Sequence, residues 1–302
     1  MNKTKKVIVI LGPTAVGKTK FAVNLAYEFN GEIISADSRQ VYIGMDIGSG
    51  KDLADYTIQN KIIKTHLIDI LKPHCEFNLY LFQKFFYSAY QDIVSQNHIP
   101  FLVGGTGLYL SSVIQKYSLN KINFNSQRAK NLENNFEEKL IEILKDLNPN
   151  LHNTTDLTEK KRIISAILIA EENEENGFPE ENLEFLIIGI NEDREILMNR
   201  IRERLKIRLK SGMIEEVENL LKDGISHEKL RFFGLEYKFV SQYLTVELNY
   251  NDMYQKLASA IIQFSKRQMT WFRKMEKEGI EINWMKNSEI ENAKILIRNF
   301  LE

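Results

Sequence analysis

The sequence GPTAVGKT, residues 12–19, follows an apolar run at 7–11 and precedes a helical pattern that begins at Phe21. It is a G-x-x-x-x-G-K-[ST] motif, and a strand before it and a helix after it are the context in which such a loop wraps phosphate with its backbone N–H groups. We therefore predict phosphate binding by all eight residues: Gly12, Pro13, Thr14, Ala15, Val16, Gly17, Lys18 and Thr19.

Two side chains of this loop have distinct expected roles. Lys18 is placed to reach the outer phosphate, and Thr19 to offer its hydroxyl to Mg²⁺. The motif alone leaves open whether the phosphate belongs to a nucleotide or to another diphosphate.

Outward from this loop, strands and helices alternate along the chain. Short apolar runs rich in β-branched residues predict strands buried on both faces at 7–11, 32–35, 66–70, 101–103 and 185–190. Alternation of such strands with helices indicates a parallel sheet covered on both sides. The predicted fold class is α/β, a P-loop NTPase-like parallel sheet flanked by helices, with a helical insertion domain.

The insertion is expected at 116–183, where no convincing strand occurs. An amphipathic stretch at 128–147, a break at Asn148-Pro149-Asn150 and a second helix from about 158 to 170 precede an acidic stretch. That stretch, 171–184, holds seven glutamates and no basic residue, which is typical of a solvated linker. We predict a core formed by 1–115 and 184–302, and a helical insertion domain at 116–183.

Composition excludes several classes of protein. The formal net charge is −1, so any affinity for nucleic acid must come from a local basic patch. Cys75 is the one cysteine, which excludes an internal disulfide, and the five histidines lack the spacing of a structural zinc site. Only five apolar residues follow the basic start, and no run approaches the ~18 of a membrane span. We expect a cytoplasmic protein that does not enter a membrane.

Polar residues follow the predicted strands where ligands bind in such sheets. Strands one and two are expected to be neighbours, which would place Asp37 across from Lys18 as a base for an incoming nucleophile. The alternatives for Asp37 are a helix cap or an indirect magnesium contact. Three glycines surround Thr106 after strand four, so its hydroxyl is a candidate for the same cavity. Asp69 resembles the carboxylate of an NTP-hydrolysing motor, but we favour a structural role.

Two segments of the C-terminal half are basic. Residues 194–210 contain seven basic and two acidic side chains, with 200, 204 and 208 on one helical face, and by itself such a run is usually a solvated face. Residues 264–274 contain four basic residues, three aromatic residues and no acid, which is a composition suited to unstacked RNA bases and phosphates. For Trp271 and Phe272 a core position is favoured, and for the adjacent basic residues contact with RNA.

Together these motifs resemble one family, the tRNA dimethylallyltransferases, also called tRNA isopentenyltransferases. The resemblance rests on GPTAVGKT at 12–19, SADSRQVY at 35–42, GMDIGSGK at 44–51, HLIDI at 66–70, VGGTGLY at 103–109 and KRQMTWFR at 266–273, in register over almost the whole chain. It implies transfer of a dimethylallyl group from dimethylallyl diphosphate to N6 of an adenosine in tRNA. That adenosine lies on the 3′ side of the anticodon in tRNAs that read codons beginning with U.

The resemblance also implies cofactors and partners. The P-loop would hold the diphosphate of the prenyl donor with Mg²⁺, and ATP binding, which a motif scan would assign, stays open. The expected partners are the tRNA anticodon stem-loop and dimethylallyl diphosphate, without a membrane, for a monomeric enzyme.

Site residues carry over by their match to the family's motifs. Asp37 matches the general base, Thr106 the threonine beside the reacting centre, and Arg204 an arginine that joins Lys18 at the pyrophosphate. Asp37 and Thr106 also count among the implied tRNA contacts, whose other members are Ser38, Arg39, Gln40, Arg128, Lys161, Arg162, Phe233, Gly234, Lys238, Lys266, Arg267, Gln268, Thr270, Trp271 and Arg273.

This sequence departs from the family's pattern in two places. Ser165 stands where the family usually has a second arginine, which puts one RNA contact in doubt. The run Gly-Leu-Glu-Tyr-Lys at 234–238 stands where a glycine–tyrosine–arginine run is commoner, so the finer contacts of that loop stay open.

Three other functions compete with this reading. A small-molecule kinase would use Asp37 to activate a hydroxyl, but no arginine-rich lid is evident and two basic tracts are unexplained. An isopentenyltransferase acting on free adenine nucleotides would not need the insertion or the segment 266–273. A non-catalytic RNA-binding module is disfavoured because Lys18, Asp37 and Thr106 are all present.

Overall fold

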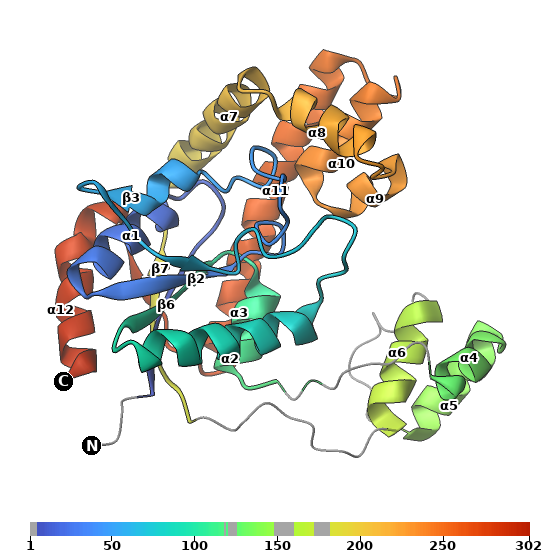
Figure 1. The fold of residues 1–302 in the computed structure, drawn as a ribbon, viewed down its shortest axis with the longest axis horizontal. Coiled ribbons are helices and arrows are strands. Elements are labelled where there is room, and N and C mark those ends of the chain that lie inside the picture. The colour runs from blue at the N-terminus through green and yellow to red at the C-terminus, as the bar shows by residue number, and fades with distance from the viewer. Residues whose placement is uncertain (1–4, 118, 120–125, 148–159, 172–181) are drawn as a thin grey trace. The chain divides into compact units, whose positions relative to one another are not determined.

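The computed structural model describes residues 5–117, 119, 126–147, 160–171 and 182–302 (Figure 1). The chain divides into two compact units. The larger is formed by Met1–Lys116 with Glu181–Glu302, and the smaller by Tyr117–Glu180. Each unit has its own apolar core.

The larger unit is built on a six-stranded sheet in the order β5-β2-β6-β1-β7-β8, in which every pairing is parallel. The strands are β1 (Lys6–Leu11), β2 (Gly31–Ala36), β5 (Thr65–His66), β6 (Ile99–Gly104), β7 (Glu184–Ile190) and β8 (Asn283–Met285). Residues 7–11 of β1 are all fully buried, as expected for a central strand covered on both faces. The predicted α/β class with a parallel sheet is confirmed.

Two details of the predicted sheet are wrong. Strands β1 and β2 are not neighbours, because β6 pairs with both and lies between them. The strand expected at 66–70 is limited to the two residues of β5. Leu67 and Asp69 have φ values of 63° and 53°, which turn the chain out of extended conformation immediately after His66.

Short elements join β2 to β5. After the 3₁₀ turn η1 (Leu53–Tyr56), strands β3 (Thr57–Ile58) and β4 (Lys61–Ile62) form a separate antiparallel pair.

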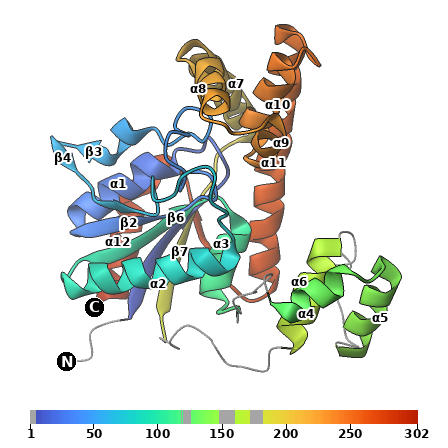
Figure 2. The ribbon, with the colours of Figure 1, turned by 45° about the vertical axis from the view of Figure 1, so that its right-hand side comes forward.

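Helices cover both faces of the sheet (Figures 1 and 2). Helices α1 and α2 lie on opposite faces of β2 and β6, and α12 packs against α1 and β7. Asn78 caps α2 (Leu79–Ser95) and Asn249 caps α11 (Tyr250–Lys277), each accepting a backbone N–H three residues ahead at 2.9 Å. The helices on the sheet are α1 (Lys18–Glu28), α2 (Leu79–Ser95), α3 (Gly107–Ile114) and, after the turn η3 (Asn287–Glu289), α12 (Ile290–Leu301).

A second group of helices, α7 to α11, follows β7. Helix α11 packs against α3, α7 and α10, and α10 packs against α8 and α9. This group is joined to the sheet through α3 and through contacts of α11 with Trp284 of β8. The helices are α7 (Arg194–Lys210), α8 (Met213–Lys222), α9 (His227–Phe232), α10 (Leu235–Leu244) and α11 (Tyr250–Lys277). Among helices of the described ranges, none combines the length and apolar character that crossing a membrane requires.

The smaller unit contains α4 (Gln127–Glu133), α5 (Glu137–Leu147) and α6 (Lys160–Glu171). The stretch predicted at 128–147 is therefore two helices, separated at 134–136. Apolar residues at helical spacing on the three helices form one core: Ala129, Leu132, Leu140, Leu144, Ile163, Ile164, Ile167 and Leu168. The break at 148–150 and nearly all of the acidic stretch at 171–184 lie outside the described residues.

Candidate active site

The P-loop follows β1 and leads into α1. Gly17, with φ +96°, is the N-cap of α1, and a Cβ at Gly12 would lie 2.5 Å from the carbonyl oxygen of Ile190. Both positions therefore require glycine, one for its backbone angle and one for a close approach. Lys18 begins α1, and its Nζ donates a hydrogen bond to the Pro13 carbonyl at 3.2 Å. The loop and the N-terminus of α1 form an anion-binding concavity.

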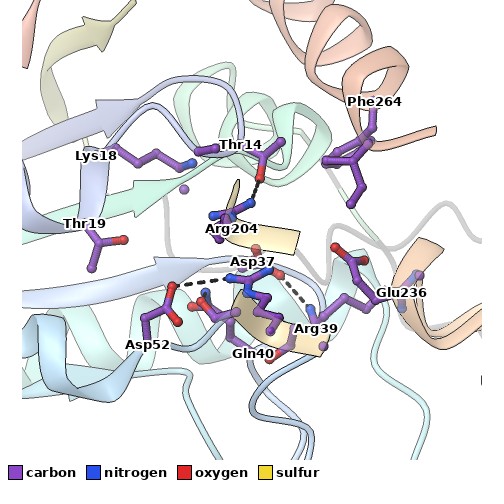
Figure 3. Close-up of a pocket in the computed structure, with 18 of the residues that line it drawn as sticks. Thr14, Lys18, Thr19, Asp37, Arg39, Gln40, Asp52, Arg204, Glu236 and Phe264 are labelled. Carbon is purple, nitrogen blue, oxygen red and sulfur yellow. Dashed lines mark hydrogen bonds and ion pairs between the residues drawn. The ribbon is translucent and has the colours of Figure 1, made fainter. Parts of the chain in front are cut away.

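A cavity of about 570 Å³ opens beside this loop (Figure 3). It lies where the carboxyl ends of β1, β2 and β6 meet, which is the usual ligand position in a parallel sheet. The P-loop, the turn after β2, the start of α3 and α7 contribute to its wall, as do the residues around α10. Predicted site residues that line it are Thr14, Ala15, Gly17, Lys18, Thr19, Asp37, Ser38, Arg39, Gln40, Thr106, Arg204, Phe233, Gly234 and Gln268.

Two cations face the cavity with unusual pKa values. Burial, and then the positive charge of Arg204, lowers the pKa of Lys18 to about 8, although Asp37 opposes this shift. Burial, and then Arg208, lowers the pKa of Arg204 to about 10. Arg204 donates a hydrogen bond to the hydroxyl of Thr14, which holds the guanidinium against the P-loop. Crowded, desolvated cations of this kind are stabilised by a multiply charged anion.

The face of α7 that carries Arg204 is solvated only at its Arg200 end. Arg200, Arg204 and Arg208 all line the cavity, but Arg200 is exposed and pairs with Glu192, whereas Arg208 is only 7% exposed and pairs with Asp52 at 3.3 Å. The interpretation of the whole run 194–210 as a solvated face is therefore wrong for Arg204 and Arg208. It holds for the opposite side of α7, where Arg202, Lys206 and Lys210 are exposed.

Asp37 follows β2 and faces the cavity from below in Figure 3. Its Oδ1 accepts the backbone N–H of Arg39 at 2.9 Å, within a turn that spans 38–41. The next helical element is η1, sixteen residues later, so the alternative that Asp37 caps a following helix is wrong. Thr106 is the N-cap of α3, but its side chain makes no capping hydrogen bond there and lines the same cavity.

Gln268 has a structural position beneath the cavity. Its Oε1 accepts the backbone N–H of Thr14 at 2.8 Å, and its Nε2 donates to the carbonyl of Gly105 at 2.8 Å. The side chain is 7% exposed and connects the P-loop to the turn after β6. The amide thus makes two hydrogen bonds within the protein, and its implied contact with tRNA stays a prediction.

Two aromatic residues predicted to face tRNA also lie inside the protein. Phe233 is buried and meets the ring of Tyr42 edge-on at 4.9 Å. Trp271 is half-buried against Gly107, and its Nε1 donates to Ser111 Oγ at 2.9 Å. Phe272 is fully buried, which confirms the core position favoured for it, whereas Trp271 packs against the core while half-buried.

The remaining predicted tRNA contacts divide by exposure. Gln40 lies at the cavity wall, where its side chain hydrogen-bonds Ser35 and the Gly50 carbonyl. In the smaller unit Arg128 pairs with Glu171, and the side chains of Lys161 and Arg162 lie outside the described residues. Five predicted contacts are exposed on the larger unit: Lys238, Lys266, Arg267, Thr270 and Arg273.

Three charged residues near the cavity were not found by sequence reasoning. Lys51 is 1% exposed, and its Nζ contacts the Tyr42 carbonyl, Asp46 and Asp69, so the structural role favoured for Asp69 is confirmed. Glu216 accepts three consecutive backbone N–H groups of 46–48 at 2.6–3.0 Å, and the Tyr237 hydroxyl at 2.9 Å. These contacts join distant segments, and no local pattern in the sequence signals them.

Glu236 is the third of these residues. It lies at the start of α10 and lines the cavity on the side away from Lys18 (Figure 3). Burial raises the pKa of its carboxyl, with a further contribution from Asp37, although Arg208 and Arg204 oppose the shift. The only sequence signal was the departure from the commoner pattern at 234–238.

Comparisons with known proteins agree with one another. A family model described as IPP transferase matches residues 40–275, and one described as isopentenyl transferase matches 5–65. The tRNA dimethylallyltransferase 1 of Geotalea uraniireducens (strain Rf4) is 51% identical over 279 residues, which cover 92% of this chain and 91% of that protein. The tRNA dimethylallyltransferase 2 of Bacteroides fragilis is 48% identical over 92% of each chain.

A solved structure is similar as well. The full-length tRNA isopentenylpyrophosphate transferase from Bacillus halodurans superposes with a TM-score of 0.72 at 29% identity. The match covers 98% of this chain and 96% of that one.

Proposed function

This chain belongs to the IPP transferase family, and we propose that its cavity transfers a dimethylallyl group from dimethylallyl diphosphate to N6 of an adenosine in tRNA. The acceptor is the adenosine on the 3′ side of the anticodon in tRNAs that read codons beginning with U. One observation carries this function: a phosphate-binding loop with two desolvated cations and a carboxylate, Asp37, share one cavity. Such a cavity can bind a diphosphate leaving group and accept a proton beside it.

The donor's diphosphate fits the cationic side of the cavity. The P-loop N–H groups, Lys18 and Arg204 would stabilise the negative charge that develops on the leaving group. Burial destabilises the charged form of Lys18, and its pKa is lowered to about 8, so an anion that enters the cavity stabilises this lysine more than it would a solvent-exposed one.

The cavity offers Mg²⁺ the Thr19 hydroxyl, and the ion would enter together with the diphosphate, whose oxygens supply further donors. Among the residues that the structure describes, no cluster of three or more His, Cys, Asp or Glu side chains could hold a metal ion. Thr19 lines the cavity beside Lys18, and Mg²⁺ commonly keeps several waters and binds through substrate phosphates. Bound in that way with the Thr19 hydroxyl, the ion would neutralise part of the leaving group's charge.

The reaction breaks the C1–O bond of the donor, with its electron pair leaving on the diphosphate, and forms a bond between C1 and N6. One N6 proton passes to Asp37, and the other remains on the product. Thr106, whose hydroxyl faces the same cavity, would orient the amine or the bridging oxygen. The acceptor base must leave its stack to reach these groups, which costs a few kcal/mol.

The test is mass spectrometry of nucleosides from unmodified tRNA incubated with the protein, Mg²⁺ and dimethylallyl diphosphate, without ATP. We expect one dimethylallyl group on adenosine, formed ~10²–10⁴-fold more slowly by the Asp37→Asn variant. Failure of the wild-type protein on several tRNAs that carry adenosine at this position would contradict the proposal. An ATP-dependent phosphorylated product would instead support the kinase alternative.

A further inference from the structure

Glu236 is an unassigned carboxyl in the reaction cavity. In the view of Figure 3, Lys18 and Thr19 lie to the left of Asp37 and Arg204, and Glu236 and Phe264 lie to their right. The side with Lys18 is the phosphate side, because it contains the P-loop. The opposite side therefore faces the acceptor, if Asp37 stands between donor and acceptor as the proposed function requires.

The acceptor side combines an aromatic ring with a carboxyl. Phe264 lies on α11 and is 38% exposed, and Glu236 lies on α10. Both side chains line the cavity. A flipped base is typically held by stacking on such rings and by hydrogen bonds to its Watson–Crick edge. Glu236 is thus positioned to contact the edge of a base that stacks near Phe264.

The charges around Glu236 determine which proton state fits. Arg208 and Arg204 of α7 and Arg39 after β2 are the cations near it, and Asp37 is the nearby anion. Burial and Asp37 favour the neutral carboxyl, and the two α7 arginines favour the charged one. Each arginine also has another anionic partner, because Arg208 pairs with Asp52 and Arg204 would face the incoming diphosphate.

Adenine itself requires a neutral partner at this edge. Its N1 accepts a hydrogen bond and its N6 amine donates, so the partner must donate once and accept once. A carboxylate only accepts, whereas a protonated carboxyl has one O–H donor and a carbonyl acceptor. Protein sites do maintain neutral carboxyls as hydrogen-bond donors, and here burial and Asp37 act in that direction.

We propose that protonated Glu236 donates its O–H to N1 of the acceptor adenine and accepts the N6–H that is not transferred to Asp37. This assignment rests on the proposed function and extends it. The bond to N1 has two chemical consequences. It occupies the lone pair of the ring nitrogen, which competes with N6 for an allylic cation, and it draws electron density from the amine and so acidifies the N6–H that Asp37 removes. Glu236 thereby directs the prenyl group to N6.

The experiment compares two acceptors and four proteins. RNA stem-loops carry adenosine or 1-deazaadenosine at the target position, the latter with C–H in place of N1. The proteins are wild type, Glu236→Gln, Glu236→Ala and Glu203→Ala. Glu203 is the matched control, because it lines the same cavity but is exposed and pairs with Lys206 at 2.7 Å. Initial rates, both KM values and the N1-to-N6 product ratio are measured after quenching at neutral pH.

The preference for adenosine should depend on Glu236. Loss of one hydrogen bond with its donor left unpaired corresponds to ~10-fold or more in kcat/KM, so wild type should prefer adenosine by that factor above the intrinsic difference. Glu236→Gln supplies the same donor and acceptor and should keep both the preference and the N6 product. Glu236→Ala should lose the preference and form some N1 product, and Glu203→Ala should behave like wild type.

Each other result has a definite meaning. An unchanged preference in Glu236→Ala, with pyrophosphate binding intact as the folding control, overturns the assignment while leaving the proposed function in place. A change confined to the donor KM, equal for both acceptors, overturns it in favour of a counter-ion for Arg208. Absence of transfer by wild type to the adenosine RNA overturns the proposed function and this assignment together.

Discussion

Replacing Gln268 with alanine tests whether this amide supports the P-loop or contacts RNA. The wild-type side chain accepts the Thr14 N–H and donates to the Gly105 carbonyl, both at 2.8 Å, and is 7% exposed. Two hydrogen bonds between neutral groups contribute about 1 kcal/mol each, so about 2 kcal/mol is lost. If this whole free energy must be supplied by the ligand to order the P-loop, the Kd for Mg²⁺-pyrophosphate rises ~30-fold, because each 1.4 kcal/mol corresponds to a factor of ten.

The assay is calorimetric titration with Mg²⁺-pyrophosphate, alongside anisotropy of a labelled anticodon stem-loop. We expect Gln268→Ala to weaken pyrophosphate binding ~10- to 30-fold and to leave RNA binding nearly unchanged. Arg267→Ala is the matched control, because Arg267 is the exposed neighbour on α11. It should weaken RNA binding and reduce its salt dependence without affecting pyrophosphate. The reverse result for Gln268→Ala, weaker RNA binding with normal pyrophosphate binding, would refute the reasoning.

Three further predictions concern the cavity and its support. Asp37→Asn should lower kcat by ~10²–10⁴-fold with RNA affinity retained, measured by single-turnover kinetics, and normal turnover would remove Asp37 from the mechanism. Because the pKa of Lys18 is lowered to about 8, Lys18 is charged below that pH and neutral above it, so pyrophosphate affinity should be constant below pH 8 and fall above it. A pH-independent Kd between 7 and 9.5 would contradict this. Lys51→Met removes the buried cation that Asp46 and Asp69 share. Because both carboxylates are partly exposed, the loss of folding stability should be about 1–3 kcal/mol in urea titrations, and no measurable loss would be inconsistent.

The parts of this protein that are predictable from sequence are those encoded locally. The P-loop and the central strands were found because a glycine spacing and an apolar run each determine their own backbone. The strand at 66–70 failed because Leu67 and Asp69 take positive φ, and the contact of Asp69 with Lys51 is set by tertiary structure. Strand β8 has only three residues, too few to give a pattern.

The candidate site shows the same limit more sharply. Whether a basic helix face meets water or a cavity depends on what packs beside it, and the same run gave buried Arg208 and exposed Lys206. Likewise the motif at 266–273 could not distinguish Gln268, which points inward, from Arg267, which points outward. Family resemblance places both residues near tRNA. Only the three-dimensional packing shows that Gln268 supports the site from within and that Arg267 lies on the protein surface.

The chemistry of this cavity differs from that of a nucleotide-hydrolysing P-loop at one position, the end of β6. A hydrolase must place a metal-bound water there, which calls for a carboxylate, whereas this strand ends in Gly104-Gly105-Thr106. The other carboxylate that could hold a metal-bound water, Asp69, forms an ion pair with Lys51. The polar groups opposite the phosphate cradle include the Thr106 hydroxyl and the carboxyls of Asp37 and Glu236, which are groups that can position and deprotonate an amine. The phosphate-binding loop therefore stabilises a diphosphate leaving group, and the nucleophile that attacks is an amine and not a metal-bound water.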